Sequence, residues 1–267
     1  MRKKRTKTSA VVTLALLAGL LCSCAGRGEA AVIVAGSTSV QPYAEILAEE
    51  FMLINPACEI DVQGGGSTAG IMAAESGAAD IGMSSRALKE AEKGLWSVEI
   101  AKDGLAVIVH PDNPVNDLTF KQIRGIYTGE ISDWGQVGGP AHHIHLIARE
   151  EGSGTRSAFE DLVMDGSWIT LKAIIQDSNG AIKQLVEGDR YAIGFISLGL
   201  VDATVKALRL EGAAATRENV INGNYRLYRP FLFIADHEPT GLANDYIDFV
   251  LSEQGQRIMS DEGLIPE

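Results

Sequence analysis

The chain has 267 residues and a formal net charge of −12, with 46% hydrophobic and 22% charged residues. This length suffices for one large domain or two smaller ones, and the composition is that of a globular protein. The acidic balance argues against a nucleic-acid partner, because binding to the phosphate backbone requires a basic surface. It does not exclude a small anionic ligand, because the donors that line a buried site matter more than net charge.

Residues 1–23 have the pattern of an export signal. Five basic residues in MRKKRTK precede the apolar run VVTLALLAGLL, which is too short for a stable membrane span. A leucine then lies three positions before Cys24 and a small residue directly before it, as in a bacterial lipobox. We therefore expect cleavage after Ser23, which takes the net charge to −17 because five basic and no acidic residues are lost. We also expect Cys24 to be lipidated, so that several acyl chains anchor the exported protein at the outer face of the cytoplasmic membrane.

The rest of the chain alternates short apolar runs with helical patterns. Strands are expected at 31–36, from 59 onward, and at 79–85, 105–111, 144–149, 192–198 and 227–236. Helices are expected at 40–56, 68–77, 119–127, 155–164, 180–187 and 241–260. This alternation is typical of an α/β fold with largely parallel sheets.

The position of the last predicted strand indicates two domains. The strand at 227–236 comes late in the chain and is followed only by a helix. One interpretation is that the chain leaves a first domain near 105–111 and returns to it near 227–235. We therefore expect residues 24–108 and 229–267 to form one lobe and residues 109–228 to form the other.

Three turns share one composition, in which glycine stands beside serine or threonine between a predicted strand and a predicted helix. They are GSTSV (36–40), GGGST (64–68) and GSGTR (152–156). The first N–H groups of a helix lack internal partners, and glycine lets a ligand approach the backbone. One such turn is more often a simple helix cap. Three of them at strand C-termini predict an anion site.

Arg149 precedes the third turn and ends the apolar run IHLIA. A guanidinium at that point can form two hydrogen bonds to one oxyanion. Glu151, two residues later, lies on the same side of an extended chain, so we expect it to hold the guanidinium in place. MSSR (83–86) follows another predicted strand and offers further polar groups, including Ser85.

These motifs resemble the phosphate-binding proteins of bacterial ABC phosphate importers, the PstS family. The resemblance runs from about residue 31 to the C-terminus, through AGSTSVQP, QGGGSTAGI, ADIGMSSR, IYTGEISDWGQVGG and AREEGSGTRSAF. It implies a two-lobed periplasmic-binding-protein-like (type II) fold, with two mostly parallel sheets, flanking helices and two crossover strands. It also implies that inorganic phosphate is clamped between the lobes and passed to membrane-embedded permease subunits with their ATPase. Carried over by motif, the phosphate-binding groups are Thr38, the backbone of Ser39, Ser67, Arg149, Ser153, Gly154 and Thr155, with Glu151 as the partner of the arginine.

Ser85 departs from the pattern of well-known family members, which have an aspartate there that accepts a proton from phosphate. We include Ser85 in the expected ligand set because a hydroxyl both donates and accepts hydrogen bonds. The departure leaves open a receptor for another tetrahedral oxyanion, namely sulfate, molybdate or tungstate.

Other classes of function have weaker support. GGSTA (65–69) differs by one residue from the Gly-x-Ser-x-Gly elbow of hydrolases, but Ala69 breaks that motif and no spacing marks a catalytic triad. His143 and His145 share a strand face without an accompanying carboxylate or cysteine cluster, so a metal site is not favoured. A purely structural lipoprotein would not need three such turns. We expect a monomeric, non-enzymatic receptor without cofactor or metal, in which Cys58 is a small buried hydrophobe.

Overall fold

The computed structural model describes residues 30–267, so the expected signal segment and Cys24 lie outside the described residues. The strands are β1 (Ala30–Gly36), β2 (Cys58–Gly64), β3 (Ile81–Ser84), β4 (Trp96–Val109), β5 (Asp117–Leu118), β6 (His145–Arg149), β7 (Ile174–Gln176), β8 (Ala192–Ser197), β9 (Lys206–Ala207), β10 (Arg209–Leu210), β11 (Tyr228–Ala235) and β12 (Ile265–Pro266). The α-helices are α2 (Gln41–Ile54), α3 (Ser67–Glu75), α4 (Phe120–Thr128), α5 (Gly154–Phe159), α6 (Asn179–Gly188), α7 (Arg217–Ile221), α8 (Leu242–Leu251) and α9 (Glu253–Asp261). Short single turns are η1 (Glu90–Glu92), η2 (Trp134–Val137), η3 (Glu160–Met164) and η4 (Leu198–Leu200).

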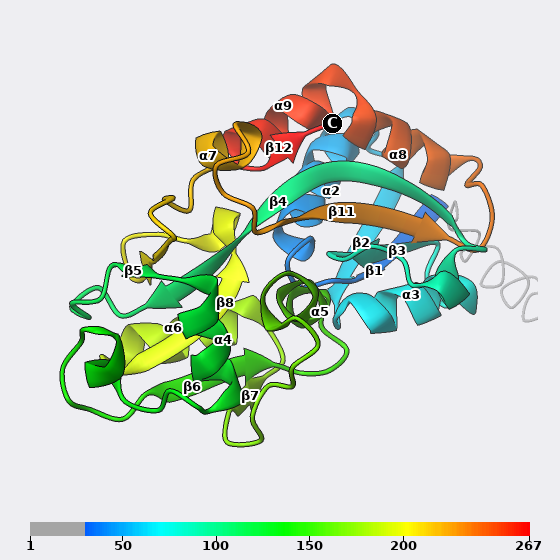
Figure 1. Ribbon diagram of the computed structural model, residues 1–267. Coiled ribbons are helices and arrows are strands. Elements are labelled where there is room, and N and C mark those ends of the chain that lie inside the picture. Colours follow the sequence, from blue (N-terminus) through cyan, green and yellow to red (C-terminus); the bar gives the residue numbers. More distant parts are fainter. Residues whose placement is uncertain (1–29) are drawn as a thin grey trace, which may run out of the picture.

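The main sheet has the strand order β2-β1-β3-β11-β4-β8-β6-β7. The strands β2, β1 and β3 are parallel to one another, as are β8, β6 and β7, whereas β11 and β4 run antiparallel to their neighbours. The long strand β4 pairs with β11 along Trp96–Gly104 and with β8 along Leu105–Val109, so it joins the two halves of the sheet (Figure 1). The expected α/β fold with two crossover strands is confirmed, and hydrogen bonds to β4 connect its two sheets.

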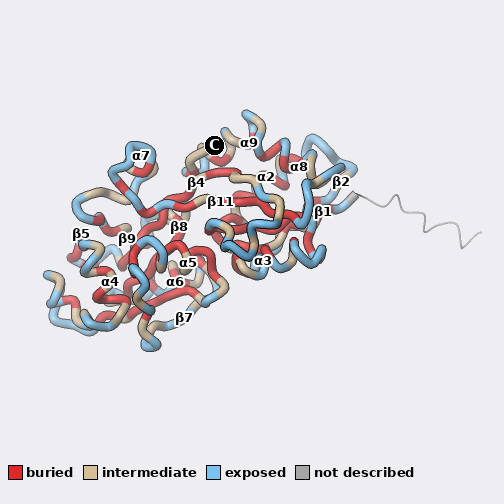
Figure 2. The backbone as a smooth tube through the Cα atoms, turned by 45° about the vertical axis from the view of Figure 1, so that its right-hand side comes forward, coloured by how far each residue is buried: buried red, intermediate tan, exposed pale blue. Residues whose placement is uncertain are grey.

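Each half of the sheet has its own hydrophobic core. The buried side chains of one large cluster come from residues 32–101 and 231–264, where α2, α8 and α9 pack on one face of the sheet. Those of the other come from residues 105–227, where α4 and α5 do the same. In Figure 2 the strands of both halves are largely buried, and the helices and loops around them are buried on some turns and exposed on others. The lobe boundaries at residues 108/109 and 228/229 stay a prediction, which the separate cores support.

A close contact between α3 and β1 places the start of α3 beside the end of β1. A Cβ on Gly70 would lie 2.5 Å from the carbonyl oxygen of Ala35 and 2.6 Å from Cα of Gly36. Only glycine allows backbones to approach this closely. This packing determines where the hydroxyl of Ser67, at the first residue of α3, is presented.

Several element boundaries differ from the sequence-based expectations. The strand expected at 105–111 begins at Trp96, because β11 supplies a hydrogen-bonding partner for its charged first half. The helix expected at 241–260 is two helices, since Ser252 is extended and caps α9 by accepting a hydrogen bond from the N–H of Gly255 at 3.2 Å. The helix expected at 155–164 continues beyond Phe159 only as the π-helical turn η3.

The expectation that Cys58 is buried was wrong. It is half-buried because β2 is the edge strand of the sheet, and its Sγ donates to the carbonyl oxygen of Asn55 at 2.9 Å. What burial it has raises the pKa of the thiol, which disfavours the reactive thiolate.

Candidate anion-binding site

The three predicted turns meet at one place, together with the end of β3. Because β1 and β3 are parallel neighbours, their C-terminal ends present Ser37 and Ser85 side by side, and the Ser37 hydroxyl donates to Ser85 Oγ at 2.8 Å. Ser67 Oγ lies 3.3 Å from Ser85 Oγ, and it accepts a hydrogen bond from the backbone N–H of Ser85 at 3.0 Å. The hydroxyls of this group are buried: Ser37, Ser39, Ser67, Ser85, Ser153 and Thr155.

The third turn comes from the other half of the molecule and packs against the first two. Thr155 Oγ1 lies 2.9 Å from Ser39 Oγ, and the N–H of Thr68 donates to the carbonyl oxygen of Gly152 at 3.1 Å. A Cβ on Gly154 would lie 2.2 Å from Ser67 Oγ and 2.6 Å from Ser85 Oγ. The contact therefore requires glycine at position 154.

Ser153 and Thr38 lie beside this cluster. Ser153 is the N-cap of α5, and its Oγ accepts a hydrogen bond from the N–H of Arg156 at 3.2 Å. Its hydroxyl hydrogen is still available to a ligand. Thr38 is half-buried and accepts a long hydrogen bond of 3.4 Å from Nδ2 of Asn179.

Arg149 is almost completely buried, with 1% of its surface exposed. Its Nε and Nη2 donate to the two carboxylate oxygens of Glu150 at 2.9 Å each, and Nη2 also donates to the carbonyl oxygen of Asp177 at 3.0 Å. Within residues 30–267, Nη1 makes no hydrogen bond and is available to an anion. The site thus contains a fixed positive charge with one unused pair of donors.

The expectation that Glu151 holds Arg149 was wrong. It assumed an extended chain, in which residues i and i+2 point to the same side, but β6 ends at Arg149 and the backbone turns at residues 151–152. This turn brings the carboxylate of Glu150 back onto the guanidinium, while Glu151 is exposed.

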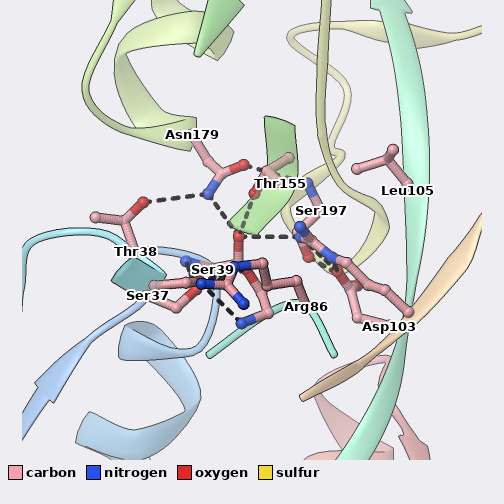
Figure 3. Close-up of polar contacts among 12 residues, drawn as sticks. Ser37, Thr38, Ser39, Arg86, Asp103, Leu105, Thr155, Asn179 and Ser197 are labelled. Carbon is pink, nitrogen blue, oxygen red and sulfur yellow. Dashed lines mark hydrogen bonds and ion pairs between the residues drawn. The ribbon is translucent and has the colours of Figure 1, made fainter. Parts of the chain in front are cut away.

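A buried polar network that no sequence motif indicated contacts Ser39 (Figure 3). Asp103 in β4 and Arg229 in β11 form an ion pair at 3.0 Å, with 1% and 2% of their side-chain surfaces exposed. Arg229 Nη2 also donates to Ser39 Oγ at 3.0 Å, and Asn179 Nδ2 donates to the same oxygen at 2.8 Å. Ser197 donates from Oγ to Asp103 at 2.8 Å. One feature of the sequence could have indicated this network, namely that the two crossover strands contain charged residues of opposite sign, Asp103 and Arg229.

Burial governs the ionisation of this pair. Loss of hydration raises the pKa of the Asp103 carboxyl, and the adjacent charge of Arg229 opposes that shift. Burial lowers the pKa of Arg229, and the positive charge of Arg149 lowers it further. A guanidinium begins so far above neutrality that Arg229 stays charged at pH 7. The buried guanidinium groups of Arg149 and Arg229 therefore both place positive charge beside the cluster of hydroxyls.

The residues considered above for a hydrolase and for a metal site have other contacts. Ser67 Oγ is hydrogen-bonded to Ser85, and none of its hydrogen bonds involves a histidine. His145 Nδ1 lies 2.6 Å from Asp189 Oδ2. Among residues 30–267 no three His, Cys, Asp or Glu side chains gather as metal ligands.

The chain is similar to known proteins in both sequence and structure. A family model described as a PBP superfamily domain matches residues 24–254. The phosphate-binding protein PstS of Bacillus subtilis is 33% identical over 246 residues, which is 90% of this chain and 82% of that protein. A structure with bound phosphate from Clostridium perfringens, described as a phosphate ABC transporter substrate-binding protein, superposes with a TM-score of 0.86 at 45% identity, covering 89% of this chain and 99% of that one. An ABC-type phosphate transport receptor from Vibrio cholerae gives a TM-score of 0.75 at 39% identity, covering 88% and 100%.

Proposed function

Because this chain belongs to the PBP superfamily and, within it, to the PstS phosphate-binding proteins, we propose that it captures inorganic phosphate outside the cytoplasm and delivers it to an ABC importer. The observation that carries the proposal is the convergence of buried hydroxyls from three strand–helix turns beside the buried guanidinium of Arg149. The relatives named above are binding proteins, and the hydrogen bonds of the Ser67 hydroxyl are to Ser85.

The ligand set follows from that convergence. The hydroxyls of Thr38, Ser67, Ser153 and Thr155 and the Arg149 guanidinium donate to phosphate oxygens, Ser39 contributes through its backbone, and Glu150 holds the guanidinium in position. Donors fixed in advance bind an anion well because little ordering is required on binding. The proposed phosphate-binding residues are Thr38, Ser39, Ser67, Ser85, Arg149, Ser153, Gly154 and Thr155.

Ser85 sets how well phosphate is distinguished from other oxyanions. Monohydrogen phosphate carries one P–OH, whose proton needs an acceptor, whereas sulfate has only acceptor oxygens. Ser85 Oγ accepts a hydrogen bond from Ser37 and lies 3.3 Å from Ser67 Oγ, so its second lone pair is free for the phosphate proton when Ser67 directs its own hydrogen to the anion. That single lone pair supports phosphate as the ligand. The abundance of donors favours, as the second candidate, a receptor for sulfate, molybdate or tungstate.

Calorimetric titration of the purified protein with inorganic phosphate tests the proposed function. We expect one phosphate bound per chain and thermal stabilisation on binding. At a phosphate concentration one hundred times Kd, the free energy of unfolding should rise by about 2.7 kcal/mol. Absence of both binding heat and stabilisation would contradict the proposal.

We further propose export and anchoring through Cys24, with membrane-embedded permease subunits and their ATPase as partners. The lipobox-like sequence around Cys24 supports the anchor. Among residues 30–267, no helix has the length and apolar character needed to cross a bilayer. The acidic chain is expected to act as a monomer that binds neither nucleic acid nor a cofactor.

Cys24→Ala should release the protein from the membrane fraction or stall its processing, because the thiol that receives the lipid is lost. Fractionation of cells followed by mass spectrometry of the N-terminus measures this. Cys22→Ala is the matched control and should leave the protein attached to the membrane. Wild-type protein recovered wholly in the soluble fraction, with Arg27 or a later residue at its N-terminus, would contradict the anchor.

A further inference from the structure

The hydroxyl of Ser39 is the centre of three hydrogen bonds from different parts of the chain (Figure 3). Arg229 Nη2 lies 3.0 Å from its Oγ, Asn179 Nδ2 lies 2.8 Å from it, and Thr155 Oγ1 lies 2.9 Å from it. Asn179 begins α6 and Thr155 lies in α5, whereas Arg229 belongs to crossover strand β11. The three contacts thus connect both halves of the sheet through one oxygen atom.

The orientation of the Asn179 amide is fixed by its other end. The backbone N–H of Ser197 can only donate, and it donates to Oδ1 of Asn179 at 3.4 Å. The Nδ2 group therefore faces Ser39 and donates to it. The Arg229 guanidinium also has only donors, and Asp103 holds its Nε and Nη2 at 3.2 and 3.0 Å.

The donors around Ser39 determine the direction of the hydrogen bond between the hydroxyls of Ser39 and Thr155. A hydroxyl oxygen has two lone pairs and one hydrogen. The N–H groups of Arg229 and Asn179 occupy both lone pairs of Ser39 Oγ, so the hydrogen of Ser39 must be donated to Thr155 Oγ1. Thr155 Oγ1 accepts that hydrogen bond from Ser39, so the hydroxyl hydrogen of Thr155 must be donated to another acceptor. Among the described residues its buried hydroxyl has no other hydrogen-bonding partner.

We propose that Arg229, Asn179 and Ser39 form a one-way hydrogen-bond relay that fixes Thr155 as a donor to an unprotonated oxygen of the bound oxyanion. Arg229 and Asn179 are then positioning residues, which act on the anion through Ser39 and Thr155. The charge of Arg229 strengthens the relay because hydrogen bonds from a charged donor are stronger than neutral ones. Asp103 keeps that charge in place. The relay rests on the proposed function for the identity of its ligand.

Loss of one relay donor should weaken phosphate binding even though that donor does not touch phosphate. Asn179→Leu frees a lone pair on Ser39, so Thr155 can donate to Ser39 instead of to the anion. We expect an affinity loss of about tenfold, which corresponds to about 1.4 kcal/mol. Thr155→Val, which removes the last hydroxyl of the relay and keeps the side-chain shape, should cost at least as much.

A double-mutant cycle separates the relay from a merely structural role. If Asn179 acts through Thr155, Asn179→Leu should change affinity less than threefold in the Thr155→Val background. A full tenfold effect there, or less than a threefold effect in the wild-type background, would overturn the relay. Asn113→Leu is the matched control, because Asn113 is a buried asparagine whose amide is hydrogen-bonded to Arg190 and Val115 outside the site. It should leave phosphate affinity unchanged.

A second variant keeps the test decisive if Asn179→Leu does not fold. Arg229→Met combined with Asp103→Leu removes the other donor to Ser39 without leaving a buried charge unpaired. The same cycle with Thr155→Val applies. If wild-type protein fails to bind phosphate, the proposed function fails, and the cycle is measured with sulfate or molybdate, whose oxygens are also acceptors. A protein that binds none of these three anions would overturn the relay as well.

Discussion

Arg149→Ala is expected to weaken phosphate binding at least about a hundredfold, which is near 3 kcal/mol. A hydrogen bond to a charged group contributes about 1.5–3 kcal/mol, and a guanidinium can make two to one anion. Arg149 is buried and already fixed by Glu150 and Asp177, so no ordering cost offsets these bonds. The substitution also leaves the carboxylate of Glu150 beside the anion without its partner. Calorimetric titration with phosphate measures the loss.

Two further variants sharpen this prediction. Arg149→Lys keeps the charge but not the planar pair of donors, so its affinity should lie between those of the wild type and Arg149→Ala. Arg124→Ala is the control, because Arg124 contacts Val163 and Asp165 instead of the turns, and it should bind phosphate normally. An affinity loss below about threefold in Arg149→Ala would mean that its guanidinium does not reach the ligand.

Gly154→Ala is expected to weaken phosphate binding by about tenfold to a hundredfold. The added Cβ would lie 2.2 Å from Ser67 Oγ and 2.6 Å from Ser85 Oγ, so the turn at 152–156 would have to move away from both hydroxyls. Overpacking of this kind costs about 1–3 kcal/mol. The clash arises only where this turn lies against the other two. The free energy of phosphate binding should therefore fall by more than the free energy of unfolding of the unliganded protein. Titration and thermal unfolding without phosphate measure the two quantities.

Gly188→Ala is the matched control for that substitution. Gly188 ends α6, and a Cβ there would have no neighbour within 4 Å. Its phosphate affinity should equal that of the wild type. If Gly154→Ala binds as tightly as Gly188→Ala, the three turns do not approach one another as closely as the site requires.

The sequence was sufficient to predict the fold class because strand and helix periodicities alternate along the chain. It was insufficient for the first half of β4, where charged residues such as Glu99 and Lys102 obscure a strand that β11 stabilises by pairing. A break in the last helix was missed because Ser252 is also compatible with a helical pattern, and its capping role depends on the local turn. Tertiary pairing and local capping decided these boundaries.

For the site, the sequence indicated the groups that follow strands in turns of recognisable composition. The three turns were indicated by glycine beside serine or threonine at a helix start, and Arg149 by its position before the third turn. The resemblance to the PstS family supplied Ser67 and Thr155 as individual ligands. Asn179 and the ion pair of Asp103 with Arg229 were missed. They reach the site only after β4 pairs with β8 and β11, which brings Asp103 to Ser197 across 94 residues of sequence and to Arg229 across 126, and no local pattern records this pairing.

Competition between phosphate and sulfate at neutral pH tests the central claim, that this chain is a phosphate receptor. The wild-type protein is titrated with phosphate at increasing sulfate concentrations, and then with molybdate and tungstate. The remaining lone pair of Ser85 should accept the phosphate proton less strongly than a carboxylate would. We therefore predict a preference for phosphate of about 2–3 kcal/mol, a factor of roughly thirty to one hundred and fifty. Sulfate binding within about threefold of phosphate, or tighter binding of molybdate or tungstate, would contradict the claim.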